Sequence, residues 1–294
     1  MRSNPQKWKY VSAGGGQQRF PVVADIWSLV GTHSSEPDQI CQSTSHFTPK
    51  PKMLVLSPHA DDAALCVGGL LLLPAARCWE QHIGTIVGIS DYAVESHSAR
   101  MNVEEVSAAR RCEDRLYAQL IGARLHQGKI LDAPLRCRTR SPFRAPMKGE
   151  YHRFEELVER WAQEINPRLI LAPAGIGGHV DHCLTRSVAE VVATRQDSDL
   201  LLYEDLPYAA MPDQRSFRDL NPPIVQWEIA TDATLLRKIA YLGAYVSQFD
   251  LASMQRLIAL HSQDGADHVE RLYVREDINV NRDTADLLGL IRRR

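Results

Sequence analysis

Two short polar motifs, each shortly after an apolar run, constrain the fold of this chain most strongly. The first is S-P-H-A-D-D at residues 57–62, directly after residues 52–56, and the second is H-V-D-H at residues 179–182, after residues 168–172. Each apolar run is typical of a buried strand, and each motif leads into a segment with helical spacing. Ligands of α/β sheets gather outside the carboxyl ends of the strands. We therefore expect both motifs to meet in one site at such an edge.

Strand-like and helix-like segments alternate over most of the chain. The strand-like runs are residues 52–56, 82–89, 168–172 and 200–203, and the helix-like segments are residues 62–73, 104–121, 154–165 and 182–195. This alternation predicts an α/β fold of Rossmann-like topology, with a largely parallel sheet and helices on both faces. In the segment 104–121, apolar residues such as Val106 and Leu116 are predicted to face the core, and Gly122 is predicted to end the helix. Residues 138–149 and 204–231 contain several prolines and are predicted to be long loops.

Length and composition favour one domain with an extension. Of the 294 residues, 44% are hydrophobic and 24% are charged, which is ordinary for a globular protein. We expect a single domain over residues 51–294 and an extension over residues 1–50 that wraps this domain or is partly disordered. A net charge of −2 gives no general attraction to nucleic acid or to an anionic membrane.

Neither a membrane segment nor a disulfide framework is expected. The longest apolar run, residues 68–76, is far shorter than the roughly 20 residues of a spanning helix, and residues 1–10 lack the apolar core of an export signal. The cysteines lie far apart and form no C-x-x-C pair, which favours reduced thiols in a cytoplasmic protein. They are Cys41, Cys66, Cys78, Cys112, Cys137 and Cys183.

The residue types of the first motif suit a catalytic metal centre. His59 and Asp62 can converge on one ion, with His182 of the second motif as the third ligand. This combination is known from catalytic zinc sites and leaves a position open for water. Asp61 can then take the proton of that water. The simpler alternative is that the two aspartates only cap a helix. The metal site is favoured because residues of metal-binding type follow both predicted strands.

The second motif adds a proton donor. His179 can face the substrate and protonate a leaving amine, and Asp181 lies close enough in sequence to orient an imidazole. The preceding glycines permit tight backbone turns near a ligand. They are Gly175, Gly177 and Gly178.

These stretches resemble the PIG-L/LmbE family of zinc-dependent N-deacetylases. Residues 54–69 resemble its P-H-x-D-D motif with a following glycine pair, and residues 179–182 resemble its H-x-D-H motif. Residues 110–122 are similar to its R-x-x-E helix that ends in Leu-Gly, and residues 238–248 are similar to its K…SQ segment. Family members remove acetyl groups from N-acetylglucosamine units in glycolipids, thiol cofactors, antibiotics and other small glycosides.

The resemblance implies a role for each matching residue. It implies three ligands of zinc, or of another divalent metal: His59, Asp62 and His182. Asp61 becomes the general base, and His179 becomes the acid or the cation that steadies the oxyanion. Asp181 would orient a histidine, and Arg110 matches a position that contacts sugar hydroxyls in some members.

Three positions depart from the family pattern. Ala60 stands where proline is usual, Ala63 where glutamate is usual, and Gly177 where some members have a tyrosine that can stabilise the oxyanion. Tyr92 or Tyr208 is available to take over that last role. We expect the activity to persist while the specificity shifts.

The proline-rich connection after residue 203 is a candidate substrate loop. Asp205 and Tyr208 are predicted to bind substrate, because carboxylates accept hydrogen bonds from sugar hydroxyls and aromatic faces pack against sugar rings. The equally weighted alternative is that Tyr203 and Leu206 anchor this loop to the core.

The expected function is zinc-dependent removal of an N-acetyl group from a small amino-sugar glycoside or glycoconjugate. One alternative is a metal hydrolase of a non-sugar amide or a phosphoester, although a phosphoester would favour two metals. Another is a non-catalytic sugar-binding relic, which would need neither Asp61 nor His179. No nucleic acid and no integral membrane segment is expected as a partner, and no oligomeric state is predicted.

Overall fold

The computed structural model describes residues 49–94, 101–210, 224–230, 232–249, 269–275, 280–289 and 292–293. All of them belong to one compact unit, Glu36–Arg294. The predicted extension over residues 1–50 falls almost wholly outside the described residues, so the division into extension and domain stays a prediction. Among the described helices, none has the length and apolar character that a membrane span requires.

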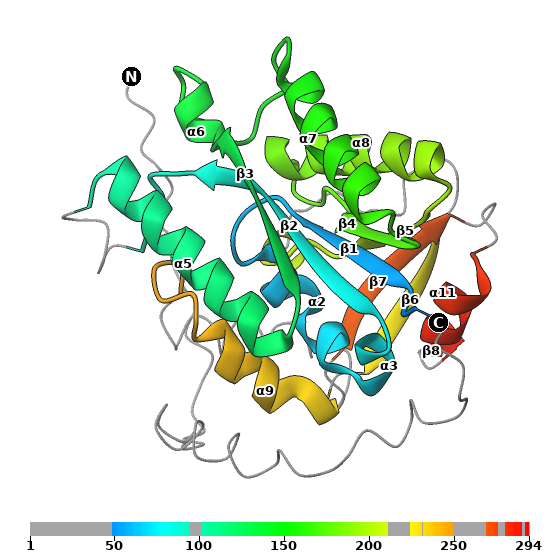
Figure 1. The fold of residues 1–294 in the computed structure, drawn as a ribbon. Helices are drawn as coiled ribbons and strands as arrows, with labels where there is room; N and C mark the ends of the chain where they lie inside the picture. The colour runs from blue at the N-terminus through cyan, green and yellow to red at the C-terminus, as the bar shows by residue number, and fades with distance from the viewer. Residues whose placement is uncertain are drawn as a thin grey trace. The chain divides into compact units, whose positions relative to one another are not determined.

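A mixed sheet forms the centre of this unit (Figure 1). Over the described residues it has eight strands in the order β3-β2-β1-β4-β5-β7-β6-β8. They are β1 (Lys52–Ser57), β2 (Glu80–Ile89), β3 (Arg124–Leu131), β4 (Leu169–Pro173), β5 (Asp199–Tyr203), β6 (Ile224–Ala230), β7 (Val269–Arg275) and β8 (Arg292–Arg293). From β3 to β5 all neighbours are parallel, whereas β7, β6 and β8 are antiparallel to their neighbours. The predicted Rossmann-like, largely parallel sheet is confirmed.

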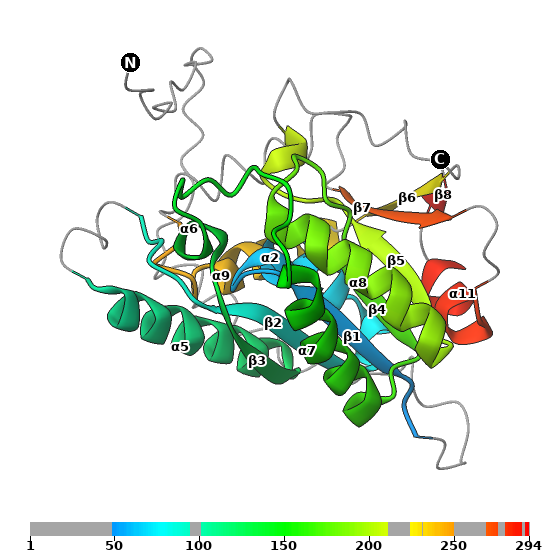
Figure 2. The same ribbon diagram turned by 90° about the horizontal axis from the view of Figure 1, so that it is seen from above.

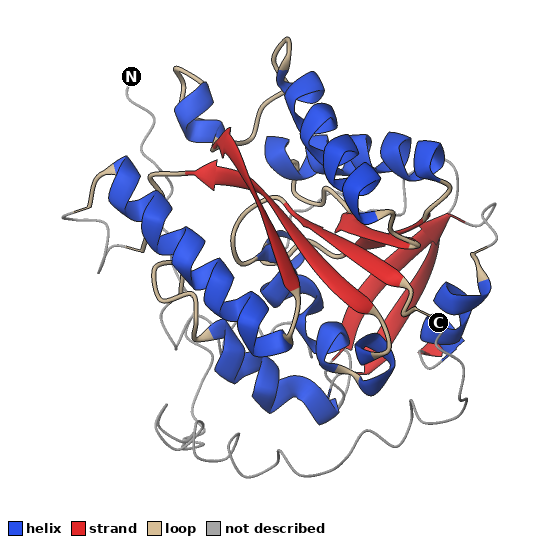
Figure 3. Ribbon diagram, in the orientation of Figure 1, coloured by secondary structure: helices blue, strands red, loops and turns tan. Residues whose placement is uncertain are grey.

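Helices cover both faces of the sheet, as predicted (Figures 2 and 3). They are α2 (Asp62–Leu72), α3 (Pro74–Arg77), α5 (Val103–Ile121), α6 (Ala133–Arg136), α7 (Glu150–Ile165), α8 (Val180–Gln196), the short 3-10 helix η1 (Tyr208–Ala210), α9 (Asp232–Leu242) and α11 (Arg282–Gly289). The pair α7 and α8 packs on one face, and α2, α5 and α9 pack on the other. Every residue of α2 is buried, so the helix that begins at the first motif runs through the core.

The ends of α5 follow from its sequence. The side chain of Asn102 accepts hydrogen bonds from the backbone N–H groups of Glu104 and Glu105, and the Glu105 carboxylate accepts one from the backbone N–H of Asn102, which forms a capping box. Gly122 ends the helix with φ of 77°, as predicted, because glycine adopts this left-handed conformation without a steric cost. The predicted core face is wrong at Leu116, whose side chain is 44% exposed.

The predicted core face is confirmed at Val106, but the buried face of α5 also carries polar residues. Glu113 accepts hydrogen bonds from the backbone N–H and the hydroxyl of Ser247, at 2.8 and 2.7 Å. Asp114 accepts from the hydroxyls of Thr85 and Tyr245, at 2.5 and 2.9 Å. Buried polar groups are tolerated when they are paired in this way, which a hydrophobic pattern does not reveal.

Three further features differ from the predictions. The predicted loop over residues 204–231 contains the strand β6, which pairs along its whole length with β7. The strand β3, with its mixed pattern R-L-H-Q-G-K-I-L, was not predicted because it lies at the edge of the sheet and most of its residues are partly exposed.

Cys78 is disulfide-bonded, so the prediction of reduced thiols throughout is wrong at this residue. The cytoplasmic location rested partly on that prediction and loses this support.

The segment that resembles the K…SQ motif ties three elements together. Lys238 of α9 forms an ion pair with Glu270 of β7, with 2.6 Å between Nζ and Oε1. The same carboxylate accepts hydrogen bonds from the backbone N–H groups of Gly69 and Leu70 in α2, at 2.8 and 2.7 Å. Both charged side chains are buried, with 5% and 1% exposed. This pair fixes the helix that carries the first motif against the antiparallel part of the sheet.

Candidate active site

The carboxyl ends of the parallel strands deliver polar residues to one place. The residues that follow these strands and meet there are His59, Asp61 and Asp62 after β1, Ser90 after β2, Asp132 after β3, His179 after β4 and Asp205 after β5. The strands β1 and β4 are neighbours in the sheet although they are not consecutive in the chain. The connections on either side of this pair run in opposite directions, which opens the crevice where α/β proteins bind ligands.

The three predicted metal ligands lie together at this switch point. One ligand atom from each of His59, Asp62 and His182 lies within 4.8 Å of the others. The carboxylate oxygen Oδ2 of Asp62 is 3.4 Å from Nδ1 of His59 and 3.5 Å from Nε2 of His182. Burial would raise the pKa of Asp62, but the two imidazoles lower it to about 2, so the group is a carboxylate.

A buried nitrogen without a partner tests whether this group fits a metal. The Nε2 atom of His182 is buried and makes no hydrogen bond to any described residue. Leaving such an atom unpaired is costly, and it faces the carboxylate of Asp62. Two imidazoles and one carboxylate are also a donor set of catalytic zinc. The residues therefore fit a divalent ion.

Buried carboxylates orient both imidazoles. Asp205 is fully buried, and its Oδ1 lies 2.7 Å from Nδ1 of His182 while its Oδ2 accepts from the backbone N–H of Ile176 at 2.9 Å. On the other side, Asp181 lies 3.2 Å from Nε2 of His59. Partners of this kind fix the ring and its tautomer, and they raise the basicity of a metal ligand. Asp205 was predicted to bind substrate; its burial and its contacts place it behind His182 instead.

The carboxyl group of Asp61 is the unpaired acid of the site. Its side chain makes no hydrogen bond or ion pair with the described residues, and it does not cap α2. Burial and the charge of Asp62 raise the pKa of Asp61 to about 8, against the opposing effect of Arg110. The backbone of Asp61 has φ of 119°, an unusual value for a residue other than glycine. Such strain is often found at functional positions.

His179 lies across the site from these groups. Its ring centroid is 4.8 Å from that of His59 and 5.1 Å from that of His182. Nδ1 of His179 accepts the backbone N–H of Asp181 at 3.2 Å, which leaves Nε2 to carry the proton. Burial and the two neighbouring imidazoles lower the pKa of His179 to about 3, which favours a neutral ring that can donate a hydrogen bond.

The glycines before His179 adopt the conformations that their predicted role requires. Their φ values are positive, at 79° for Gly175, 88° for Gly177 and 74° for Gly178. Residues with a Cβ atom rarely adopt such values. The turn after β4 that places His179 at the start of α8 thus depends on glycine.

The loop after β5 brings an aromatic ring to the site. The ring of Tyr208 lies 5.4 Å from that of His182 and 5.9 Å from that of His179. Its hydroxyl makes no hydrogen bond to the described residues, and burial together with nearby carboxylates raises the pKa of Tyr208. The anchoring alternative holds for the rest of this loop, since Leu206 is buried and the hydroxyl of Tyr203 donates to the carbonyl of Leu56 at 2.8 Å.

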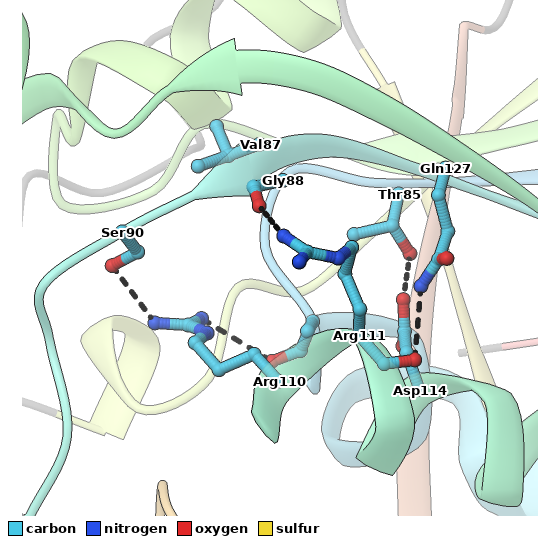
Figure 4. Close-up of a pocket in the computed structure, with 9 residues that line it drawn as sticks. Thr85, Val87, Gly88, Ser90, Arg110, Arg111, Asp114 and Gln127 are labelled. Carbon is cyan, nitrogen blue, oxygen red and sulfur yellow. Dashed lines mark hydrogen bonds between the residues drawn. The ribbon is translucent and has the colours of Figure 1, made fainter. Parts of the chain in front are cut away.

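Arg110 lies behind the site. Its guanidinium donates to the hydroxyl of Ser90 at 3.3 Å (Figure 4). It also donates to the carbonyls of Ala60 and Tyr92, each at 3.4 Å. The residue is buried at one side of a pocket that Arg111, Thr85 and Gln127 also line. In this position it braces the turn that carries Asp61. The predicted contact with sugar hydroxyls is not supported by this geometry.

Two functional residues were missed from the sequence. Asp132 directly follows β3, and its Oδ1 lies 3.7 Å from Nε2 of His59. Arg136 forms a buried ion pair with Asp181. Asp132 could have been found by examining the residue after every parallel strand. That search would have required a prediction of β3, which was not made.

Asp132, Asp181, His59 and His179 form a second group with metal-ligand spacing. If Nδ1 of His59 faces an ion, its Nε2 carries the proton and donates to Asp181 at 3.2 Å. An ion at the second group would have to displace that proton. The second group is therefore better explained as support for His59.

Comparisons with known proteins point to N-deacetylases. The family model PIG-L, described as GlcNAc-PI de-N-acetylase, matches residues 54–193. The 2'-N-acetylparomamine deacetylase of Streptomyces fradiae is 29% identical over 223 residues, which cover 73% of this chain and 79% of that protein.

Solved structures share the fold. A deacetylase of the teicoplanin biosynthesis pathway aligns with a TM-score of 0.63 at 21% identity, over 78% of this chain and 100% of the other. The 4-carboxy-2-hydroxymuconate hydratase GalB of Pseudomonas putida aligns with a TM-score of 0.54 at 18% identity, over 79% and 99% of the two chains. At these identities the likeness concerns the fold, which serves more than one reaction. The predicted resemblance is confirmed by the PIG-L family model, which matches residues 54–193 of this chain.

Proposed function

We propose that this protein is a zinc-dependent N-deacetylase that hydrolyses the N-acetyl group of a small amino-sugar glycoside. The observation that carries the proposal is the buried, unpartnered Nε2 of His182, which faces Asp62 beside the unpaired carboxyl group of Asp61. The family model and the Streptomyces relative, both described as acting on N-acetyl groups, support the reaction and the class of substrate.

The residues of the site divide the work of amide hydrolysis. His59, Asp62 and His182 would hold the ion, which when bound lowers the pKa of a water molecule and polarises the amide carbonyl. Asp61 accepts the proton of the attacking water, whose oxygen forms a bond to the acyl carbon. The carbon–nitrogen bond then breaks, and the departing nitrogen takes the proton that Asp61 received from the water, while Nε2–H of the neutral His179 donates a hydrogen bond to that nitrogen. Acetate and a free amine are the products.

Tyr208 supplies the oxyanion donor that Gly177 lacks. Its ring contacts those of His179 and His182, and its hydroxyl is not engaged by any described residue. Tyr92, the other candidate from the sequence, is 58% exposed. The hydroxyl of Tyr208 is therefore the better placed of the two to donate to the oxygen of the amide.

The same observations weigh against the alternatives. A phosphoesterase with two ions would need the second group of ligands, in which Nε2 of His59 already bonds Asp181. A sugar-binding relic would have no use for an unpaired, half-buried carboxyl group such as that of Asp61, since such a group costs stability.

Two variants test the proposal on the full chain. His182→Ala should abolish stoichiometric zinc binding, measured by mass spectrometry of the native protein. Asp61→Asn should keep the ion yet lower the turnover of 2'-N-acetylparomamine or N-acetylglucosamine about a hundred- to ten-thousandfold, followed by release of acetate. Full zinc occupancy in His182→Ala, or a near wild-type kcat in Asp61→Asn, would contradict the assignment.

A further inference from the structure

An exposed aromatic ring lies beside His179 of the site. Phe143, in the connection between α6 and α7, is 56% exposed although it is large and apolar. Its ring lies 5.9 Å from that of His179 and 6.0 Å from that of Tyr208, at 80° and 85° to them. Exposed apolar side chains are ordinary when they are scattered. One that contacts two rings of the active site calls for an explanation.

The segment that carries Phe143 is held in place on three sides. The backbone N–H of Val180, at the start of α8, donates to the carbonyl of Pro142 at 2.9 Å. Arg144 forms a two-pronged pair with Glu150 of α7, at 2.6 and 2.8 Å. Arg140 forms an ion pair with Asp91, just after β2. The exposure of Phe143 is therefore a property of an anchored segment.

A chain of oppositely charged side chains links this segment to the site. Glu150 also accepts from Nε of Arg136 at 2.7 Å, and Arg136 pairs with Asp181, which bonds His59. Burial alone would raise the pKa of Glu150, but its two arginines and a backbone N–H lower it to about 2. The position of Phe143 is thus fixed relative to the ligands of the ion.

The direction of the reaction decides which part of a substrate meets this ring. The acyl group must lie at the ion and Asp61, and the departing nitrogen must lie at His179. The fragment that carries the nitrogen then extends past His179, where the ring of Phe143 begins. On an amino sugar that fragment is the pyranose ring, whose C–H groups form an apolar face.

We propose that Phe143 is a specificity-determining residue that stacks against the pyranose ring bearing the amide. The inference rests on the proposed function and extends it from the amide to the sugar. Aromatic stacking adds to the gain from covering apolar surface. We expect it to act on binding of the sugar and not on the chemical step, because Phe143 does not reach the reacting atoms.

Steady-state acetate release from three substrates tests this proposal. The substrates are 2'-N-acetylparomamine, N-acetylglucosamine and N-acetylethanolamine, which carries the same amide without a ring. Phe143→Ala should raise KM for both sugars about tenfold, with kcat within about threefold of wild type because the catalytic groups are untouched. Phe143→Trp should restore KM, and Phe143→Leu should not. For N-acetylethanolamine, wild type and Phe143→Ala should have equal kcat/KM.

A matched control and a binding measurement keep the test decisive. Leu116→Ala removes a side chain that is 44% exposed on α5 and should leave every constant unchanged. Calorimetric titration with 2'-N-acetylparomamine should show weaker binding by Phe143→Ala whether or not the wild type turns it over. An unchanged Kd and KM in Phe143→Ala, an equal loss for N-acetylethanolamine, or full restoration by Phe143→Leu would overturn the stacking role. Absence of acetate release by wild type from all three substrates would instead contradict the proposed function.

Discussion

The buried pair of Lys238 and Glu270 offers a sharp test of what holds this fold together. Glu270 accepts hydrogen bonds from the Lys238 ammonium and from two backbone N–H groups of α2, at 2.6, 2.8 and 2.7 Å. In Glu270→Gln the side chain keeps its shape but loses its charge, and its NH₂ group replaces one acceptor oxygen. The ammonium is then left in the core without a counter-charge. Breaking a buried pair on one side costs about 3–5 kcal/mol.

Urea unfolding of the full chain measures this cost by linear extrapolation. Glu270→Gln should lower the free energy of unfolding by about 3–5 kcal/mol. Lys238→Met combined with Glu270→Gln should recover part of that loss, because the stranded charge is gone. Glu156→Gln, which breaks a pair with His152 on the surface of α7 where the glutamate is 65% exposed, should cost less than about 1 kcal/mol. A loss below about 1 kcal/mol in Glu270→Gln, or a double variant no more stable than this single one, would refute the reasoning.

Three further predictions concern the site and the far end of the sheet. Asp205→Asn should weaken zinc binding about ten- to a hundredfold, measured by competition with a chromophoric chelator, because His182 loses the carboxylate that orients it; unchanged affinity would dismiss that role. Tyr208→Phe should lower kcat for N-acetylglucosamine about a hundredfold with little change in KM, whereas a rise in KM alone would assign Tyr208 to sugar binding. The rings of His82 and His126 share a hydrogen bond of 3.0 Å, and burial lowers the pKa of each, with Glu80, Arg124 and Glu164 as the charged neighbours. Their contribution to stability is complete above about pH 6.5 and is lost as the pH falls below it, so His126→Gln should flatten the decline of the melting temperature between pH 7 and pH 5; an unchanged slope would exclude the pair as its source.

The parallel half of the sheet was predictable because its signals are local. Buried strands such as β1 and β4 are short apolar runs, and α5 carries its own start and stop at Asn102 and Gly122. The antiparallel half was not predictable by the same means. β6 follows two prolines, which favoured a loop over residues 204–231, and its residues pair with residues of β7 that lie 39 to 51 positions further along the chain. Pairing over such a distance leaves no local pattern.

The candidate site divides in the same way. His59, Asp62 and His182 were found because each lies in a compact motif after a recognisable strand. Asp132 was missed because the strand before it is a partly exposed edge strand. Asp205 was also named, but its contact with the imidazole of His182 could not be foreseen, since a sequence does not tell whether a carboxylate faces substrate or the back of an imidazole. Phe143 lies in a segment predicted only as a loop, and its contact with His179 depends on the anchors provided by Val180 and Glu150.

The backbone of the turn after β4 limits how this enzyme could have evolved. Some members of the family that this chain resembles have tyrosine at the position of Gly177. In this chain Gly177 has φ of 88°. A tyrosine introduced there would have to hold a left-handed backbone or move the turn that sets His179. A single substitution to tyrosine at Gly177 is therefore costly, and the proposed oxyanion donor is more easily kept on the loop that carries Tyr208. Changes in substrate preference would then enter through the segments around Phe143 and Tyr208, while the turn at Gly177 stays fixed.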